Sequence, residues 1–151
     1  MLNEDYRELL QELSVEKVKF LLVGAYALAA HGYPRATVDL DIWVMPSPEN
    51  AKAVFRALAR FGAFLNSLTE RDLQQEGIVF QIGVAPRRID IITSASGLQF
   101  DDAFRNSISL DIEGIQVHVL SMDDLIRNKR ATGRTKDLAD AEALEALKAA
   151  E

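Results

Sequence analysis

The stretch "RATVDLDIWV", residues 35–44, alternates apolar and polar side chains, which predicts a strand with one face on a core. The opposite face carries Asp39 and Asp41, although aspartate is unfavourable in strands and like charges on one face repel. Side chains at i and i+2 share a face, and the rise per residue of a strand places their Cα atoms roughly 7 Å apart. The two carboxylates can therefore bind one cation, or they can simply point into solvent. Trp43 shares this face, and we expect it to cover the sheet.

A third aspartate occurs in a similar setting later in the chain. Asp90 lies within "RIDII", between Ile89 and Ile91, which predicts another largely buried strand. Three aspartates on neighbouring strands would form a site with oxygen ligands only. Such a site suits Mg²⁺ or Mn²⁺ and not zinc. A divalent cation would also offset the repulsion between Asp39 and Asp41, which favours the cation-binding interpretation.

The segment "VGAYALAAHG", residues 23–32, precedes these aspartates and predicts a strand that ends at Val23 and a helix after Gly24. Free backbone N–H groups at the start of a helix attract anions, and glycine lets a phosphate approach closely. A strand, a glycine and a helix are common together, so this segment alone is a weak signal. It becomes informative because the aspartate pair and then Asp90 follow it along the chain. A phosphate seat, a pair of carboxylates and a third carboxylate are the parts that metal-assisted phosphoryl chemistry requires.

The remaining periodicity predicts an α/β (α+β) domain with a mixed sheet over residues 1–151. Helices are predicted after the cap Asn3, over 25–32, from Ser47 to Gly62, over 69–75 and 100–105, and after Ser121, with Gly133 dividing the last region before 135–149. Strands are predicted over 18–24, 38–45, 78–84 and 88–93, and in a hairpin over 107–120 that turns at Glu113-Gly114.

The composition of the chain is that of an ordinary globular protein, with 48% hydrophobic and 26% charged residues. The chain has no cysteine, so disulfides and thiolate metal sites are excluded and we expect a cytoplasmic protein. Its longest apolar stretch, 20–30, is too short to span a membrane. A net charge of −6 argues against a general nucleic-acid coat. The run "RNKRATGRTK", 127–136, has five basic and no acidic residues, as a basic patch or a solvated helix end would.

These motifs together resemble the polymerase-β-type nucleotidyltransferase superfamily, in particular its small bacterial members. These are the minimal nucleotidyltransferases and the AbiEii-like toxin–antitoxin nucleotidyltransferases. The family pattern matches Gly24-Ala25, Asp39-x-Asp41 and Asp90, and the residues Arg35-x-Thr37 also match the small members. The segment "NKRATGRTKDLADAEAL", 128–144, is similar to their closing helical motif. The resemblance spans residues 18–147 and implies the nucleotidyltransferase fold, a mixed sheet with flanking helices on one side and the metal site on its open side.

The resemblance also implies a role for each matching residue. Asp39 and Asp41 would hold a nucleotide-bound Mg²⁺ or Mn²⁺, and Asp90 would help to hold a second ion and activate the attacking hydroxyl. The residues implied in nucleotide binding are Gly24, Ala25, Arg35, Thr37, Lys129, Arg134 and Lys136. The three basic residues of the closing motif can instead offset a helix dipole or be solvated at the surface.

The implied activity is metal-dependent transfer of a nucleoside monophosphate from an NTP, expected to be ATP, to a hydroxyl group. The acceptor would be a protein or an RNA such as tRNA, within a toxin–antitoxin system. One departure from the family favours an alternative, since Ala25 stands where serine or glycine is usual and lacks a hydroxyl for a phosphate oxygen. In that alternative the chain is a non-catalytic nucleotide-binding antitoxin with a degraded site. A D-x-D glycosyltransferase is disfavoured because the chain is short for two substrate domains.

Overall fold

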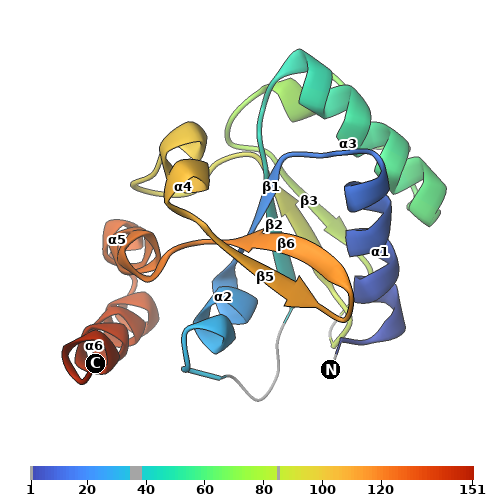
Figure 1. The fold of residues 1–151 in the computed structure, drawn as a ribbon. Coiled ribbons are helices and arrows are strands. Elements are labelled where there is room, and N and C mark those ends of the chain that lie inside the picture. Colours follow the sequence, from blue (N-terminus) through green and yellow to red (C-terminus); the bar gives the residue numbers. More distant parts are fainter. Residues whose placement is uncertain (1, 35–38, 85) are drawn as a thin grey trace.

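The computed structural model describes residues 2–34, 39–84 and 86–151, and its centre is a mixed six-stranded sheet in the order β3-β4-β2-β1-β6-β5 (Figure 1). Neighbouring strands are antiparallel in the pairs β1–β2, β3–β4 and β5–β6 and parallel in the pairs β2–β4 and β1–β6. The strands are β1 (Phe20–Val23), β2 (Leu40–Val44), β3 (Val79–Ile82), β4 (Ile89–Ile92), β5 (Ile108–Ile112) and β6 (Ile115–Val119). The prediction of a mixed α/β sheet is confirmed.

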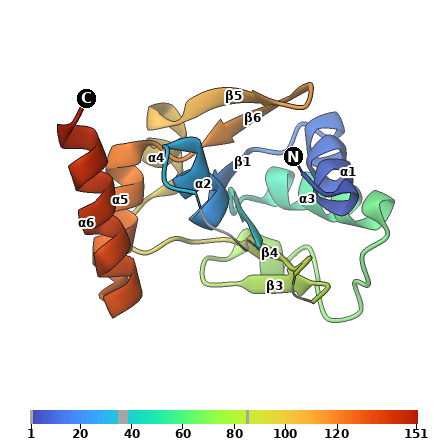
Figure 2. The same ribbon diagram turned by 90° about the horizontal axis from the view of Figure 1, so that it is seen from below.

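Helices flank this sheet on both sides. Helices α1 (Glu4–Val15) and α3 (Pro48–Phe61) lie together on one side, and α5 (Met122–Thr132) and α6 (Thr135–Ala149) lie on the other (Figure 2). Helix α2 (Gly24–Ala30) follows β1, and α4 (Phe100–Asn106) places the Phe100 ring edge-on to Trp43, with centroids 5.2 Å apart. The expectation of helices on one side alone is therefore wrong, because Trp43 on the aspartate face is apolar and α4 buries it.

The ends of the helices lie where the sequence predicts them. Side-chain oxygens of Asn3, Ser47 and Ser121 each accept a hydrogen bond from a backbone N–H three residues later, at 2.9–3.2 Å. Gly62 and Gly133 end α3 and α5 in the left-handed conformation. The predicted helix over 69–75 is reduced to a 3₁₀ turn, Asp72–Gln74. Strand β2 begins at Leu40, and Val38 of its predicted range lies outside the described residues.

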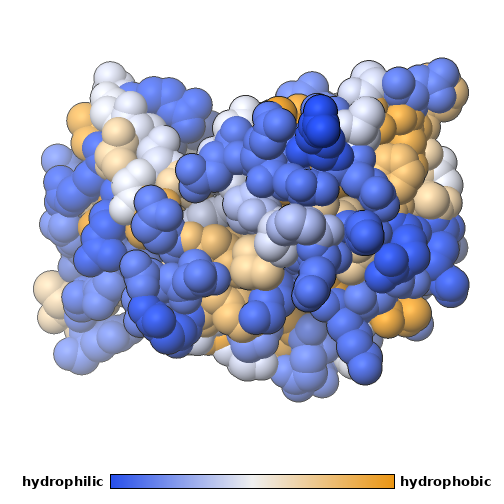
Figure 3. Space-filling model, turned by 90° about the horizontal axis from the view of Figure 1, so that it is seen from above, coloured by the Kyte–Doolittle hydropathy of each residue, from blue (hydrophilic) through white to orange (hydrophobic). Residues whose placement is uncertain are grey.

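The apolar face of β2 is fully buried, with Leu40, Ile42 and Val44 each 0% exposed, as its alternating pattern predicts. The surface seen in Figure 3 is mainly hydrophilic, with small hydrophobic areas between the polar side chains. Within the described part of the chain, no helix has the length and apolarity needed to cross a membrane.

Candidate active site

A cavity of about 610 Å³ collects the predicted site residues from distant parts of the sequence. Its walls come from the β1–α2 junction, from β2, β3 and β4, and from α5 and α6. Every predicted site residue that the structure describes lines it: Gly24, Ala25, Asp39, Asp41, Asp90, Lys129, Arg134 and Lys136. Arg35 and Thr37 lie outside the described residues. The lining is completed by the apolar residues Leu28, Val79 and Ile92 and by the charged residues Arg88, Asp137 and Asp140.

The parallel pairing of β2 and β4 sets Asp41 beside Asp90. The two residues are register partners, so their side chains leave the same face of adjacent strands. Burial raises the pKa of Asp41 to about 7, and the charges of Asp90 and Asp39 and a hydrogen bond with Asp90 add to the effect, against a smaller opposing effect of Arg88. The Asp41 carboxyl is therefore partly protonated near neutral pH.

Arg88 joins two of the aspartates, and the sequence analysis did not predict it as a site residue. Its Nη2 atom lies 3.0 Å from Asp39 Oδ2, and its Nε atom lies 3.2 Å from Asp90 Oδ1. Nη2 also donates to Asp90 Oδ2 at 3.3 Å. The period-two alternation of a strand could have identified this residue, because Arg88 precedes Asp90 by two and therefore shares its face.

The carboxylates do not form a ready metal site in this arrangement. Among the residues that the structure describes, no group of three or more His, Cys, Asp or Glu side chains is positioned to hold a metal ion. The donor set nevertheless fits Mg²⁺ or Mn²⁺, because it consists of carboxylate oxygens alone. One of them, Asp90 Oδ1, is buried and accepts no hydrogen bond from the described residues, although it forms an ion pair with Arg88. A metal-binding role for Asp39, Asp41 and Asp90 stays a prediction.

Gly24 brings the start of α2 against the carboxylates. Its φ angle is +63°, and a Cβ atom at this position would lie 2.1 Å from Asp41 Oδ2. Only glycine avoids both the backbone strain and this collision. Val23, the residue before the helix, provides no side-chain cap, so the first N–H groups of α2 have no side-chain cap bond and adjoin Asp41. This geometry agrees with the predicted seat for a phosphate at Gly24 and Ala25, whose role stays a prediction.

Replacing Gly24 by alanine should lower the free energy of unfolding by roughly 2–4 kcal/mol, because left-handed strain is added to displacement of Asp41. Gly133→Ala is the matched control, since Gly133 has a similar φ of +71° but a Cβ atom added there would meet nothing within 4 Å. We expect that variant to lose roughly 1 kcal/mol. Urea denaturation of the three proteins measures the difference, and equal losses would show that contact with Asp41 is unimportant.

Lys129 is held within a buried ion cluster between α5 and α6. Its Nζ atom lies 3.2 Å from Asp137 Oδ1 and 3.2 Å from Asp140 Oδ2. Burial opposes ionisation of Asp137, but hydrogen bonds from Thr132, Lys129 and Arg134 outweigh it and lower the pKa of this carboxyl. Lys129 thus braces the two helices, and its charge is balanced by aspartates, which differs from the solvated or dipole-compensating alternatives. Its predicted contact with phosphate stays a prediction.

The two other basic residues predicted to bind nucleotide, Arg134 and Lys136, are more exposed to solvent than Lys129. The side chain of Arg134 is 75% exposed while it contacts Asp137 through a 2.7 Å bond from Nε. Lys136 is exposed and, among the described residues, has no ion-pair partner within 4 Å. These two side chains are therefore more exposed than Lys129, and their contact with phosphate stays a prediction.

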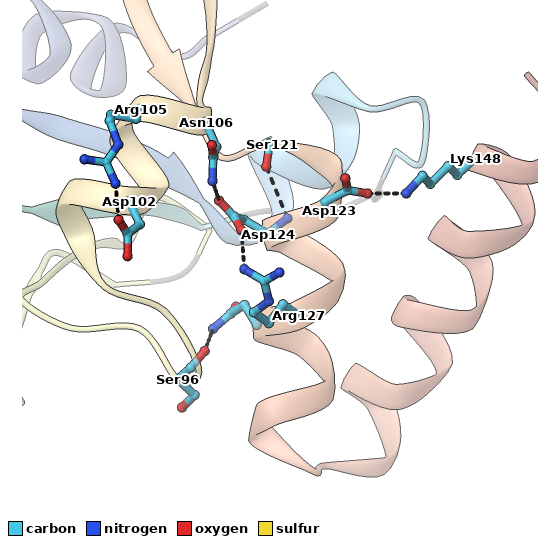
Figure 4. A network of polar contacts seen from close by, with 10 residues as sticks. Ser96, Asp102, Arg105, Asn106, Ser121, Asp123, Asp124, Arg127 and Lys148 are labelled. Carbon is cyan, nitrogen blue, oxygen red and sulfur yellow. Dashed lines mark hydrogen bonds and ion pairs between the residues drawn. The ribbon is translucent and has the colours of Figure 1, made fainter.

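A second polar network anchors the far end of α5 (Figure 4). The buried side chain of Asp124 accepts hydrogen bonds from Asn106 Nδ2 at 3.3 Å and Arg127 Nη1 at 3.0 Å. Asn128 Nδ2 donates to the backbone oxygen of Ser96 at 2.9 Å, and Lys148 pairs with Asp123. These contacts connect α5, which contributes Lys129 to the cavity wall, to α4, to the loop before α4 and to α6.

Comparison with known proteins identifies the same family. A family model described as "Nucleotidyltransferase of unknown function (DUF6036)" matches residues 1–150. No curated protein matches the chain. The protein TM1012 from Thermotoga maritima, described as "a putative nucleotidyltransferase", is similar in structure, with a TM-score of 0.58 and 18% identity over 100% of this chain and 97% of that one. The antibiotic-resistance factor ANT(2'')-Ia has a TM-score of 0.58 and 16% identity over 97% of this chain and 88% of its own. At these identities the two structures show a shared fold.

Proposed function

Because the chain belongs to a family of nucleotidyltransferases of unknown function, we propose that it transfers a nucleoside monophosphate from an NTP, ATP in the first place, to a hydroxyl group of another molecule. One observation carries the proposal. The register of β2 and β4 sets Asp41 beside Asp90, and Gly24 at the start of α2 lies directly against the Asp41 side chain. Asp39, Asp41 and Asp90 would hold Mg²⁺ or Mn²⁺. A bound divalent cation would neutralise the triphosphate and the developing charge on the reacting oxygens.

The residues of the chain would divide the work between nucleotide and acceptor. Gly24 and Ala25 would contact the triphosphate from the β1–α2 junction, and Arg134 and Lys136, which line the same cavity at the start of α6, would neutralise its charge. Arg35 and Thr37 are proposed to assist this binding. Asp90, which lines the cavity beside Asp41, would accept the proton of the attacking hydroxyl.

The acceptor that we favour over RNA is a protein. Four of the five basic residues in the run 127–136 form ion pairs with aspartates or a glutamate: Arg127, Lys129, Arg130 and Arg134. Their charge is therefore largely balanced, and the net charge of the whole chain is −6. Nucleic-acid binding depends on unpaired cations near the phosphates. We propose a partner protein of a toxin–antitoxin pair as the acceptor, with tRNA as the alternative acceptor to test.

A transfer assay tests the proposal directly. NTP labelled in the α-phosphate, Mg²⁺ and either a neighbouring-gene protein or total tRNA are incubated with the enzyme. We expect a labelled acceptor and release of pyrophosphate with the wild type, and neither with Asp39→Asn/Asp41→Asn. Titration of Mn²⁺ with NTP should show binding that the double variant loses. Equal metal and nucleotide binding by both proteins would place the site elsewhere.

A second candidate function is a non-catalytic nucleotide-binding antitoxin. It is favoured by the missing hydroxyl at Ala25 and by the ion pairs of Arg88 with Asp39 and Asp90, which occupy two of the three carboxylates. The two candidates differ in one outcome. Tight binding of metal and NTP, without transfer to any acceptor in a native lysate, would support the antitoxin.

Introducing serine at position 25 should tighten NTP binding by up to roughly 1 kcal/mol, the net worth of one hydrogen bond. The added hydroxyl would contact a phosphate oxygen from a residue that already lines the cavity. Ala29→Ser is the control, because Ala29 is an exposed residue of the same helix and is not among those that line the cavity. Calorimetric titration with a non-hydrolysable NTP measures the change, and weaker binding would mean that position 25 does not face the phosphates.

A further inference from the structure

We propose that Arg88 is a built-in counterion that competes with the divalent cation for Asp39 and Asp90, and that the displaced guanidinium then binds the phosphates of the nucleotide. The inference rests on the proposed function, since it concerns the same carboxylates. It gives Arg88 two successive partners within one cavity and makes it a further nucleotide-binding residue of the site.

The contacts of Arg88 show the competition. The guanidinium reaches one oxygen of Asp39 and both oxygens of Asp90, at 3.0–3.3 Å. Within the described part of the chain, no other cationic side chain forms an ion pair with these two carboxylates. A metal ion bound by Asp39 and Asp90 would need the same oxygen lone pairs. The guanidinium and a metal ion therefore compete for these lone pairs, and their positive charges also repel each other.

The local charge favours exchange of the guanidinium for a stronger cation. Arg88 contacts two carboxylates, those of Asp39 and Asp90, and Asp41 lies beside Asp90, so a single guanidinium leaves the cluster with excess negative charge. Its side chain is 37% exposed, which keeps part of it hydrated and lowers the cost of breaking both pairs. A compact divalent ion compensates the cluster more fully than a single delocalised charge does.

The backbone of Arg88 is fixed, so displacement would be a side-chain movement. The carbonyl oxygen of Arg88 accepts hydrogen bonds from Leu40 N and from the Tyr6 hydroxyl, each at 3.0 Å. The long side chain therefore swings about a held Cα atom, and it lines the same cavity as Ala25 and Lys136. A guanidinium matches phosphate oxygens with two parallel N–H donors. The freed group thus has an anionic partner within reach once a nucleotide is bound.

Binding measurements on Arg88→Gln test the inference without relying on catalysis. Mn²⁺ alone, followed by the EPR signal of the free ion, should bind about tenfold more tightly to Arg88→Gln than to wild type, because the competing cation is absent. A non-hydrolysable NTP should bind about tenfold more weakly to the Mn²⁺-loaded variant. Arg87→Gln, at the exposed neighbouring position, should change neither value. Arg88→Lys keeps the charge but loses the bidentate contact, so its affinities for Mn²⁺ and for the NTP should lie between those of wild type and Arg88→Gln.

A purely structural role for Arg88 gives the opposite sign. If Arg88 only braces the carboxylates, Arg88→Gln and Arg88→Lys should both bind Mn²⁺ more weakly, and this result would overturn the inference. Equal Mn²⁺ affinity of wild type and Arg88→Gln would overturn it too. One combined result would reject the inference and leave the proposed function standing. In that result, Asp39→Asn/Asp41→Asn abolishes Mn²⁺ binding, but Arg88→Gln does not raise the affinity for Mn²⁺. If neither the wild type nor Arg88→Gln binds Mn²⁺, both the inference and the proposed function are rejected.

Discussion

Replacing Asp90 by asparagine should lower the rate of nucleotidyl transfer by about 10²–10⁴-fold, the usual contribution of a general base. Asparagine has nearly the same size, so the buried position between Ile89 and Ile91 stays filled. It cannot accept the proton of the attacking hydroxyl. We expect nucleotide affinity to fall by less than about tenfold, because the proposed role of Asp90 is realised mainly in the transition state. Single-turnover transfer from labelled NTP and equilibrium titration separate the two quantities.

Two further variants make this prediction specific. Asp41→Asn should lose both nucleotide binding and transfer, since Asp41 adjoins the helix start at Gly24. Asp101→Asn, an exposed aspartate in the first turn of α4, should lose neither. Transfer by Asp90→Asn at the wild-type rate would remove Asp90 from the chemistry. If Asp90→Asn instead loses most of its nucleotide affinity, the main role of Asp90 is to bind the metal and nucleotide.

Stability without metal should decrease as the pH rises from about 4 to about 7, by roughly 2–4 kcal/mol. The cause is Asp41, whose burial beside Asp90 and Asp39 raises its pKa from 3.8 to about 7. Between these values the folded protein holds a proton that the unfolded chain has released, so the folded state is favoured at the lower pH. The loss is complete above about pH 7, where both states are ionised.

Urea denaturation in EDTA at pH 5 and pH 8 measures this effect. Asp41→Asn should be less sensitive to pH over this interval and more stable than wild type at pH 8, because one of the repelling charges is gone. Adding Mg²⁺ at pH 8 should stabilise the wild type more than this variant, since a ligand of the folded state alone raises its stability. A wild type whose stability is the same at both pH values in EDTA would show that Asp41 ionises normally.

Much of the fold follows from local signals in the sequence. Caps at Asn3, Ser47 and Ser121 mark helix starts, and the turn at Glu113-Gly114 marks the β5–β6 hairpin, in which both residues have positive φ. The strand order was not predictable in this way, because it depends on pairing between segments far apart in the chain. The covering of Trp43 by α4 is likewise a long-range contact, which explains the wrong expectation of one open face.

The site was also partly predictable, because some of its features depend on local patterns and others on long-range contacts. Alternation along single strands predicts the faces of Asp39, Asp41 and Asp90, and the structure brings all three to one cavity. Their roles stay predictions. Arg88 could have been identified from its spacing to Asp90, but its contact with Asp39 crosses between strands. The ion pairs of Lys129 with Asp137 and Asp140 depend on how α6 folds back on α5, which residue spacing alone does not specify.

The parallel pairing of Asp41 with Asp90 also determines which changes in chain length the site would tolerate. The segment between β2 and β4 includes α3 and the β3 strand, and loops within it can gain or lose residues while the two strands keep their register. One residue inserted inside β2 or β4 would turn the following side chains to the opposite face. Among relatives, we therefore expect the distance along the chain between Asp41 and Asp90 to vary, while the two-residue spacings from Asp39 to Asp41 and from Arg88 to Asp90 stay constant.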